Sequence, residues 1–170
     1  LGLLHLYYGD GKGKTTAAMG LALRMAGRGR PVAVAQFMKG QDSGERAALA
    51  LLPSVTLLEV PDQVKFSFLL TEAEFQAESA RSLRLLEEAA ALARRPDWGL
   101  LVLDEVCTAV EVGLLPLQSV LDCLDVPAEV VLTGHNPHPA LLDRADYITR
   151  MEKLRHPYDK GISARRGVEF

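Results

Sequence analysis

Residues 7–16, with the sequence YYGDGKGKTT, constrain the fold of this chain more than any other stretch. A mostly apolar run, residues 3–8, leads into Gly9, Gly11 and Gly13, and a helix-compatible segment follows. A strand that turns through glycines into a helix is the context of a phosphate-binding loop. Spaced glycines let successive backbone N–H groups point inward, and the helix N-terminus adds the positive end of its dipole. The stretch therefore predicts a cradle for phosphate groups.

The loop departs from the usual pattern at one position, because a glycine normally stands five residues before the Gly-Lys-Thr. That position is Tyr8, and Gly9 comes one place late. A turn that only joins a strand to a helix has no need of Lys12 and Lys14 beside three glycines, whereas such a concentration of like charge favours a bound anion. We therefore expect Lys14 to reach the phosphate oxygens of a nucleotide.

A magnesium site is predicted from two parts of the chain. The first is the hydroxyl of Thr15 or Thr16, and the second is the acid pair Asp104 and Glu105, which follows the apolar run 100–103. Carboxylates at the C-terminal end of a buried strand lie where open α/β sheets bind ligands. One of them is expected to hold Mg²⁺ directly or through water, as a Walker B acid does. The alternative is that these acids only cap the following helix.

Six short apolar runs predict strands, and most of them are continuously apolar rather than alternating. This pattern is typical of a parallel sheet that helices cover on both faces. We therefore expect a single-domain α/β fold of the P-loop (RecA-like) type over residues 1–170, with a mostly parallel six-stranded sheet flanked by helices. The runs are residues 3–8, 32–37, 55–60, 100–103, 129–133 and 147–151.

The clearest helix is expected over residues 71–95. Thr71 and Glu74 have the spacing of a capping box, and Pro96 stops the helix at its other end. Its apolar stripe comprises Phe75, Leu83, Leu86, Ala90 and Ala93. Further helices are expected over residues 15–27, 44–52, 116–124 and 139–145. The connection 61–70 is unusual, because it is apolar where a loop should be polar.

The amino-acid composition restricts the partners and the cellular compartment that we expect for the protein. The 170 residues carry 19 Lys and Arg against 22 Asp and Glu, so the net charge of −3 offers no general footprint for nucleic acid or an anionic membrane. No apolar run approaches the roughly 20 residues that span a bilayer. Cys107 and Cys123 lack metal or redox spacing, and we interpret them as buried free thiols of a cytoplasmic protein. The chain begins at Leu1 rather than Met, which leaves open a missing N-terminal segment.

Nucleotide binding with Mg²⁺ leaves several functions open. Two carboxylates in tandem also suit hydrolysis, where the second orients a water against the γ-phosphate, so a generic ATPase is one alternative. A small-molecule kinase normally has an arginine-rich lid, and residues 139–153 hold only Arg144, Arg150 and Lys153 as cations. A nucleotide-sensing protein without turnover is a third class.

The chain resembles the P-loop ATP:corrinoid adenosyltransferase family along essentially its whole length and in order. The stretches that carry the resemblance are GDGKGKTTAAMGLALRMAGRG, VAVAQFMKG, LLVLDEV, VVLTG, LLDRADYI and RHPYDKGISARRGVEF. The shortened loop is that family's own form, so Tyr8 is not a defect in this context. The resemblance implies transfer of the 5′-deoxyadenosyl group of ATP to a Co(I) corrinoid, which leaves inorganic triphosphate, in cobalamin biosynthesis or salvage.

The resemblance also assigns roles to particular residues. It places the triphosphate on the loop formed by Gly9, Asp10, Gly11, Lys12, Gly13, Lys14, Thr15 and Thr16. Thr15, Asp104 and Glu105 become the neighbours of the metal, which is Mg²⁺ or Mn²⁺. Arg24 matches an arginine near the nucleotide. His156, Gly161 and Arg165 belong to a segment that closes over the nucleoside.

Phe66 and Phe68 match an aromatic pair that, in the family, packs beneath the corrin ring. The alternative is that both are ordinary core residues under a long loop. His135 stands where members commonly carry arginine, and together with His138 it has the spacing of a weak ligand pair, although surface histidines are the commoner case. The same resemblance implies a homodimer and makes a flavoprotein the candidate electron donor for Co(II).

Overall fold

Six strands form one sheet in the computed structural model, which describes residues 1–170. The strand order is β3-β2-β4-β5-β1-β6, and every neighbouring pair is parallel. The predicted α/β class and parallel sheet are therefore confirmed. The strands are β1 (Leu4–Tyr8), β2 (Val32–Gln36), β3 (Val55–Leu57), β4 (Leu100–Asp104), β5 (Glu129–Gly134) and β6 (Tyr147–Arg150).

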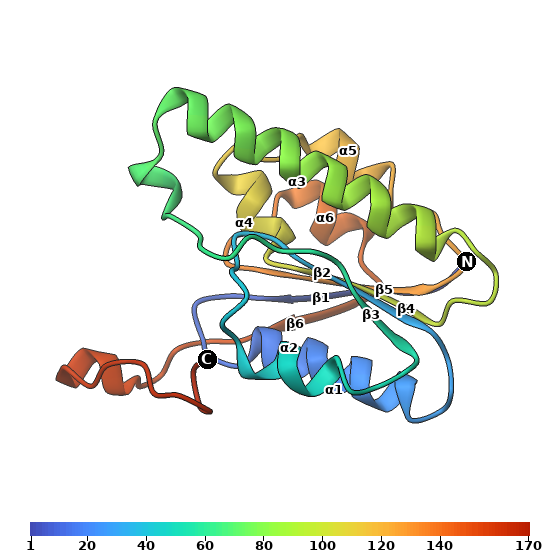
Figure 1. The fold of residues 1–170 in the computed structure, drawn as a ribbon, viewed down its shortest axis with the longest axis horizontal. Coiled ribbons are helices and arrows are strands. Elements are labelled where there is room, and N and C mark those ends of the chain that lie inside the picture. Colours follow the sequence, from blue (N-terminus) through green and yellow to red (C-terminus); the bar gives the residue numbers. More distant parts are fainter.

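Helices cover both faces of the sheet (Figure 1). One face carries α1 (Lys14–Ala26) and α2 (Gly44–Leu49), and the other carries α3 (Glu72–Ala93), α4 (Val106–Glu111), α5 (Leu117–Leu121) and α6 (Pro139–Arg144). Two short 3₁₀ turns, η1 (Ser67–Leu69) and η2 (Pro157–Lys160), lie in the connection before α3 and after β6. None of the helices has the length and apolar character needed to cross a membrane.

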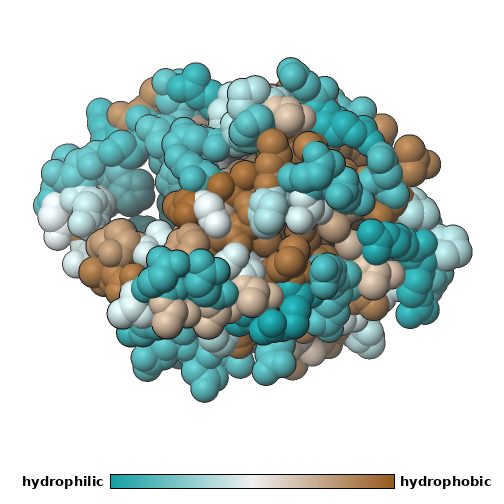
Figure 2. Space-filling model, turned by 90° about the horizontal axis from the view of Figure 1, so that it is seen from above, coloured by the Kyte–Doolittle hydropathy of each residue, from teal (hydrophilic) through white to brown (hydrophobic).

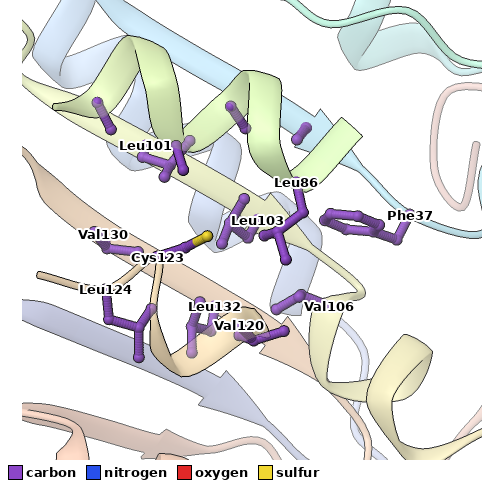
Figure 3. Close-up of a cluster of buried hydrophobic side chains, with 14 of the residues drawn as sticks. Phe37, Leu86, Leu101, Leu103, Val106, Val120, Cys123, Leu124, Val130 and Leu132 are labelled. Carbon is purple, nitrogen blue, oxygen red and sulfur yellow. The ribbon is translucent and has the colours of Figure 1, made fainter. Parts of the chain in front are cut away.

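The central strand β4 shows why these strands are continuously apolar. Leu100 and Val102 join a buried cluster beneath α1, whereas Leu101 and Leu103 join the larger cluster beneath α3 (Figure 3). Successive side chains of a strand point to opposite faces, so a strand covered on both sides needs apolar residues at every position. All five residues of β4 are buried, Asp104 included.

The edge strand β6 departs from this rule. It pairs only with β1, and all four of its residues, Tyr147–Arg150, are exposed. The continuous burial that the sequence pattern predicts therefore holds for β2 and β4, which are buried at every residue, and not for this edge strand.

Helix α3 follows its sequence signals closely. Thr71 is the N-cap, its hydroxyl accepts a hydrogen bond from the Glu74 N–H, and the Glu74 carboxylate accepts one from the Thr71 N–H. The predicted capping box is thus confirmed. The helix ends at Ala93, just before Arg94, Arg95 and Pro96.

Two local features differ from the sequence predictions. Strand β3 ends at Leu57 rather than at Val60, and α4 was not expected.

Both cysteines are buried free thiols, as the sequence predicted. Cys107 lies in α4, and Cys123 follows α5. On the face seen from above, hydrophobic side chains gather toward the middle among hydrophilic ones (Figure 2).

Candidate active site

The glycine-rich loop begins one residue later than the usual pattern because Tyr8 belongs to the sheet. Tyr8 is in register with Gly134 of β5 and Arg150 of β6, and its carbonyl accepts a hydrogen bond from the Met151 N–H at 2.7 Å. A side chain at this position costs nothing, since the backbone is still extended. The turn itself starts at Gly9.

Glycine is required at Gly9 for two reasons. Its φ of 116° is rarely adopted by residues with a side chain, and an added Cβ would lie 2.3 Å from the carbonyl oxygen of Met151. The N–H of Gly11 donates to the same carbonyl at 2.8 Å. A hydrogen bond therefore holds the loop against the segment that follows β6.

The start of α1 is an open anion site. Gly13 is the N-cap with φ 111°, no side chain caps the first turn, and this turn holds no acidic residue. The first N–H groups of a helix have no partner within the helix, so here they are free for an anion. Lys14 is 8% exposed and its ammonium donates to the Gly11 carbonyl at 2.9 Å, which folds the side chain over the loop.

The acid pair lies across from this helix. Asp104 is fully buried at the end of β4, and one carboxylate oxygen accepts hydrogen bonds from the hydroxyls of Thr15 at 2.9 Å and Thr133 at 2.7 Å. Strand β5 separates β4 from β1, so the acids do not lie on the strand next to the loop strand. Thr133 lies on β5, the strand between them, and its hydroxyl hydrogen-bonds to Asp104.

Glu105 occupies the turn between β4 and α4. Its φ of 61° is left-handed, its N–H donates to the Thr133 hydroxyl at 2.8 Å, and its carboxylate accepts a hydrogen bond from the Thr108 hydroxyl at 2.6 Å. This left-handed turn places Glu105 in the wall of the loop cavity. Glu105 and Asp104 therefore play different parts, one at the cavity wall and one behind it.

A cavity of about 560 Å³ opens between the loop, the acids and the last residues of the chain. The C-terminal residues 167–170 form part of its wall. Hydrogen bonds from Arg165 lower the pKa of Glu169, and the positive charge of Lys12 lowers it further. The cavity is lined by Lys12, Gly13, Lys14, Thr15, Thr16, Met19, Lys39, Gly44, Glu45, Glu105, Gly167, Val168, Glu169 and Phe170.

The oxygen ligands present here suit a magnesium ion. Thr15 and Glu105 line the cavity with a hydroxyl and a carboxylate, Asp104 lies behind the wall and accepts a hydrogen bond from the Thr15 hydroxyl, and no group of three or more His, Cys, Asp or Glu side chains is placed to hold a metal by itself. Mg²⁺ usually takes one or two carboxylates and completes its shell with phosphate oxygens and water. The chemistry of the site therefore fits a metal that arrives with a nucleotide.

Several residues expected near the nucleotide lie elsewhere. Arg24 is in the last turn of α1, about 15 Å along the helix from Lys14, so it does not reach the loop within this chain. The Asp10 carboxylate accepts a hydrogen bond from the Lys153 N–H, which lowers the pKa of Asp10. Its side chain is thus directed to the C-terminal segment rather than into the cavity.

The C-terminal segment reaches the cavity only with its last residues. His156 caps η2 and lines, together with Arg165, a separate cavity of about 60 Å³. Glu169 borders both cavities and pairs with Arg165 at 3.0 Å. Gly161 follows η2 in a left-handed conformation and does not line the loop cavity. The segment therefore lies against the site without these residues entering it.

Phe66 and Phe68 are surface residues. Their side chains are 70% and 79% exposed, and the rings stack on each other with centroids 5.5 Å apart. The alternative that both belong to the core is therefore wrong. The connection that carries them lies at the same end of the sheet as the phosphate loop and the C-terminal segment (Figure 1).

Sequence reasoning missed the residues that hold Asp104 in place. Thr133 is the polar residue near the end of β5, and Gln36 is the fully buried polar residue that ends β2. Gln36 donates to Asp104 at 3.2 Å and accepts from Arg46 at 3.0 Å. A polar residue at the end of an otherwise apolar buried strand is the signal that could have identified both.

His135 and His138 do not form a pair of ligands for a metal with an acid or cysteine. The His138 ring accepts a hydrogen bond from the Ala140 N–H and caps α6, and the His135 N–H donates to the Thr108 hydroxyl. His135 is exposed beside the acid turn.

The loop on β1, the uncapped helix and the acids on β4 define the class: this is a P-loop nucleotide-binding protein. The family model described as ATP:corrinoid adenosyltransferase BtuR/CobO/CobP matches residues 1–170. The chain therefore belongs to the ATP:corrinoid adenosyltransferase family. This confirms the resemblance seen in the sequence, and it makes the protein a transferase whose substrates are ATP and a corrinoid.

Individual relatives agree with this assignment. The corrinoid adenosyltransferase of Pseudomonas aeruginosa is 37% identical over 173 residues, which cover 99% of this chain and 84% of the relative. The corrinoid adenosyltransferase CobA of Salmonella typhimurium is 33% identical over 178 residues, covering 99% and 86%. The corrinoid adenosyltransferase of Escherichia coli K12 is 30% identical over 178 residues, with the same coverage.

Replacing Glu105 by glutamine should weaken the dependence on Mg²⁺ more than it weakens turnover at saturating metal. An amide keeps the shape but loses the charge that a hard cation requires, so the Mg²⁺ concentration at half-maximal rate should rise roughly tenfold. Glu111→Gln is the matched control on α4, because Glu111 pairs with Asn136 outside the cavity. Identical Mg²⁺ titrations for Glu105→Gln and the unaltered enzyme would remove Glu105 from the metal site.

Proposed function

We propose that the enzyme transfers the 5′-deoxyadenosyl group of ATP to the Co(I) ion of a corrinoid and releases inorganic triphosphate. The observation that carries the proposal is the placement of two unlike surfaces at one end of the sheet. A phosphate loop with a free helix N-terminus lies there, and so does the exposed aromatic pair Phe66 and Phe68. The first suits a polyphosphate, and the second suits a flat macrocycle.

The reaction requires a good leaving group rather than a base. The cobalt electron pair forms a bond to C5′ of the ribose, the C5′–O bond breaks, and its electron pair departs with the triphosphate. Lys14, Lys12 and the first N–H groups of α1 face the position where that charge accumulates, so they stabilise the transition state. A Mg²⁺ ion held through Thr15, Asp104 and Glu105 would neutralise further phosphate charge, and Mn²⁺ would serve the same purpose.

The tandem acids keep hydrolysis as a second candidate function. Glu105 lines the loop cavity, where a general base could orient water against the γ-phosphate. The exposed aromatic pair has no part in that reaction, which favours the transferase.

The identity of the phosphate product separates the two functions. With Mg²⁺, ATP and chemically reduced cobalamin, we expect one triphosphate for each light-sensitive adenosylcobalamin formed, as measured by ³¹P NMR and the absorption spectrum. Without corrinoid, release of ADP should be negligible. Brisk formation of ADP and phosphate in the absence of corrinoid would contradict the proposal and favour the hydrolase.

We further propose that the enzyme works in the cytoplasm as a homodimer, in cobalamin biosynthesis or salvage, and that a reduced flavoprotein supplies the electron that converts Co(II) to Co(I). The support for these statements is the family to which the chain belongs.

A further inference from the structure

Lys39 is a third lysine at the wall of the loop cavity, and it comes from a part of the chain that the phosphate loop does not include. It follows the end of β2, after Met38, whose φ of 55° is left-handed and rare for a residue with a side chain. Phe37, one residue earlier, is fully buried and its N–H donates to the Asp104 carbonyl at 2.9 Å. The sharp turn after this anchor directs Lys39 back toward the site.

The Lys39 ammonium lies between two carboxylates. It donates to Glu45 at 2.7 Å and lies 3.7 Å from the second carboxylate oxygen of Asp104, the oxygen that Thr15 and Thr133 do not use. The side chains of Lys39 and Glu45 are 28% and 24% exposed, so the pair is partly screened from water. Lys39 therefore neutralises the acid that we assign to the metal site.

Gln36 fixes both carboxylates around this ammonium. Its amide donates to Asp104 at 3.2 Å and to Glu45 at 3.4 Å, and Arg46 holds the amide oxygen at 3.0 Å. Lys39, by contrast, has a flexible four-carbon stem that can swing while these groups stay in place. Lys39 could therefore leave these carboxylates without breaking the hydrogen bonds that Gln36 makes to them.

We propose that Lys39 is a ligand of the triphosphate, held on Glu45 and Asp104 in the empty site and transferred to phosphate oxygens when a divalent cation takes its place beside Asp104. The proposal rests on the proposed function, whose leaving group is an unusually highly charged anion. A divalent cation beside Asp104 repels the ammonium that lies 3.7 Å from the same carboxylate, so the incoming metal favours displacement of Lys39. The displaced ammonium then finds its nearest acceptors on the phosphates that arrive with the metal.

Binding of inorganic triphosphate tests this role without any turnover. By isothermal titration calorimetry with Mg²⁺, Lys39→Met should weaken triphosphate binding roughly tenfold or more, because a charge-assisted hydrogen bond is lost. Lys65→Met is the matched control, since that lysine pairs with Glu74 and does not line the cavity. It should stay within about twofold of the unaltered protein. In the absence of triphosphate, Lys39→Met should bind Mn²⁺ more tightly, as measured by electron paramagnetic resonance, because the competing cation is gone.

A second variant separates this role from a purely structural ion pair. Glu45→Gln breaks the same pair but leaves the ammonium free for phosphate, so triphosphate affinity should be unchanged or higher. If Lys39→Met and Glu45→Gln weaken binding alike, or if neither changes it, the proposal is wrong. Failure of the adenosyl transfer itself would appear instead as missing adenosylcobalamin from the unaltered enzyme, whatever the binding data show.

Discussion

Replacing Lys14 by alanine is expected to slow adenosylation by roughly two to three orders of magnitude at saturating ATP and Mg²⁺. The Lys14 ammonium lies on the loop, bonded to the Gly11 carbonyl and almost shielded from water. A charge held in such a place needs no reorganisation as negative charge builds on the departing triphosphate. By analogy with the loss of one oxyanion donor, its removal should raise the barrier by about 3–4 kcal/mol.

The measurement is a single-turnover rate with pre-formed Co(I), compared between the unaltered enzyme, Lys14→Ala and Lys14→Met. The methionine variant keeps most of the buried volume, so a shared defect would trace to the charge and not to a cavity. Arg95→Ala serves as a control for the loss of a surface cation outside the cavity, since Arg95 pairs with Asp97. Near-normal turnover of both Lys14 variants would rule out the assigned role.

Truncating Phe66 or Phe68 to alanine should impair adenosylation when a mild reductant supplies electrons to Co(II), and should leave ATP affinity nearly unchanged. A Co(II) corrinoid with its lower axial ligand attached is hard to reduce, because that ligand donates into the orbital that must accept the electron. Two stacked rings can fill the space under the macrocycle and present no donor atom to cobalt. Each ring contributes about 0.5–1.5 kcal/mol of aromatic contact beyond the area it buries, so the loss should be roughly tenfold per ring.

The exposure of these rings allows an effect on catalysis to be distinguished from an effect on stability. Because both side chains are mostly exposed, truncation should change the free energy of unfolding by no more than about 0.5 kcal/mol, as is usual for surface positions. With pre-formed Co(I) the defect should shrink. Leu154→Ala is a suitable control, since Leu154 is 90% exposed and lies outside the aromatic connection. A parallel loss of thermal stability and ATP binding in the Phe variants would overturn this interpretation.

The fold could be predicted from the sequence wherever one local signal was sufficient. The run Leu100–Leu103 is apolar at every position because both faces of β4 are covered. Thr71 and Glu74 satisfy each other's backbone groups within one turn, so their spacing alone identifies the start of α3. The glycine loop has the same local character, since the strand, the turn and the helix follow one another directly.

The rest of the site depends on contacts that spacing does not encode. Thr133 reaches Asp104 from a strand 29 positions away in the sequence, and only the strand order brings it there. The left-handed turn at Glu105 ends β4 and starts α4 within one residue, whereas acids and β-branched residues gave no helix signal. The exposure of Phe66 and Phe68 depends on the path of a connection that has almost no regular structure.

The two buried cysteines have a consequence for the cobalt chemistry. Burial raises the pKa of the Cys107 thiol to about 12, with the charge of Glu105 adding to the effect, and burial also raises the pKa of Cys123. Only the thiolate coordinates a metal or attacks as a nucleophile. At neutral pH, Cys107 and Cys123 therefore stay in the thiol form and present no thiolate ligand to an oxidised corrinoid. Burial of these two side chains in the core thus removes both thiols as competing ligands for the cobalt of the substrate.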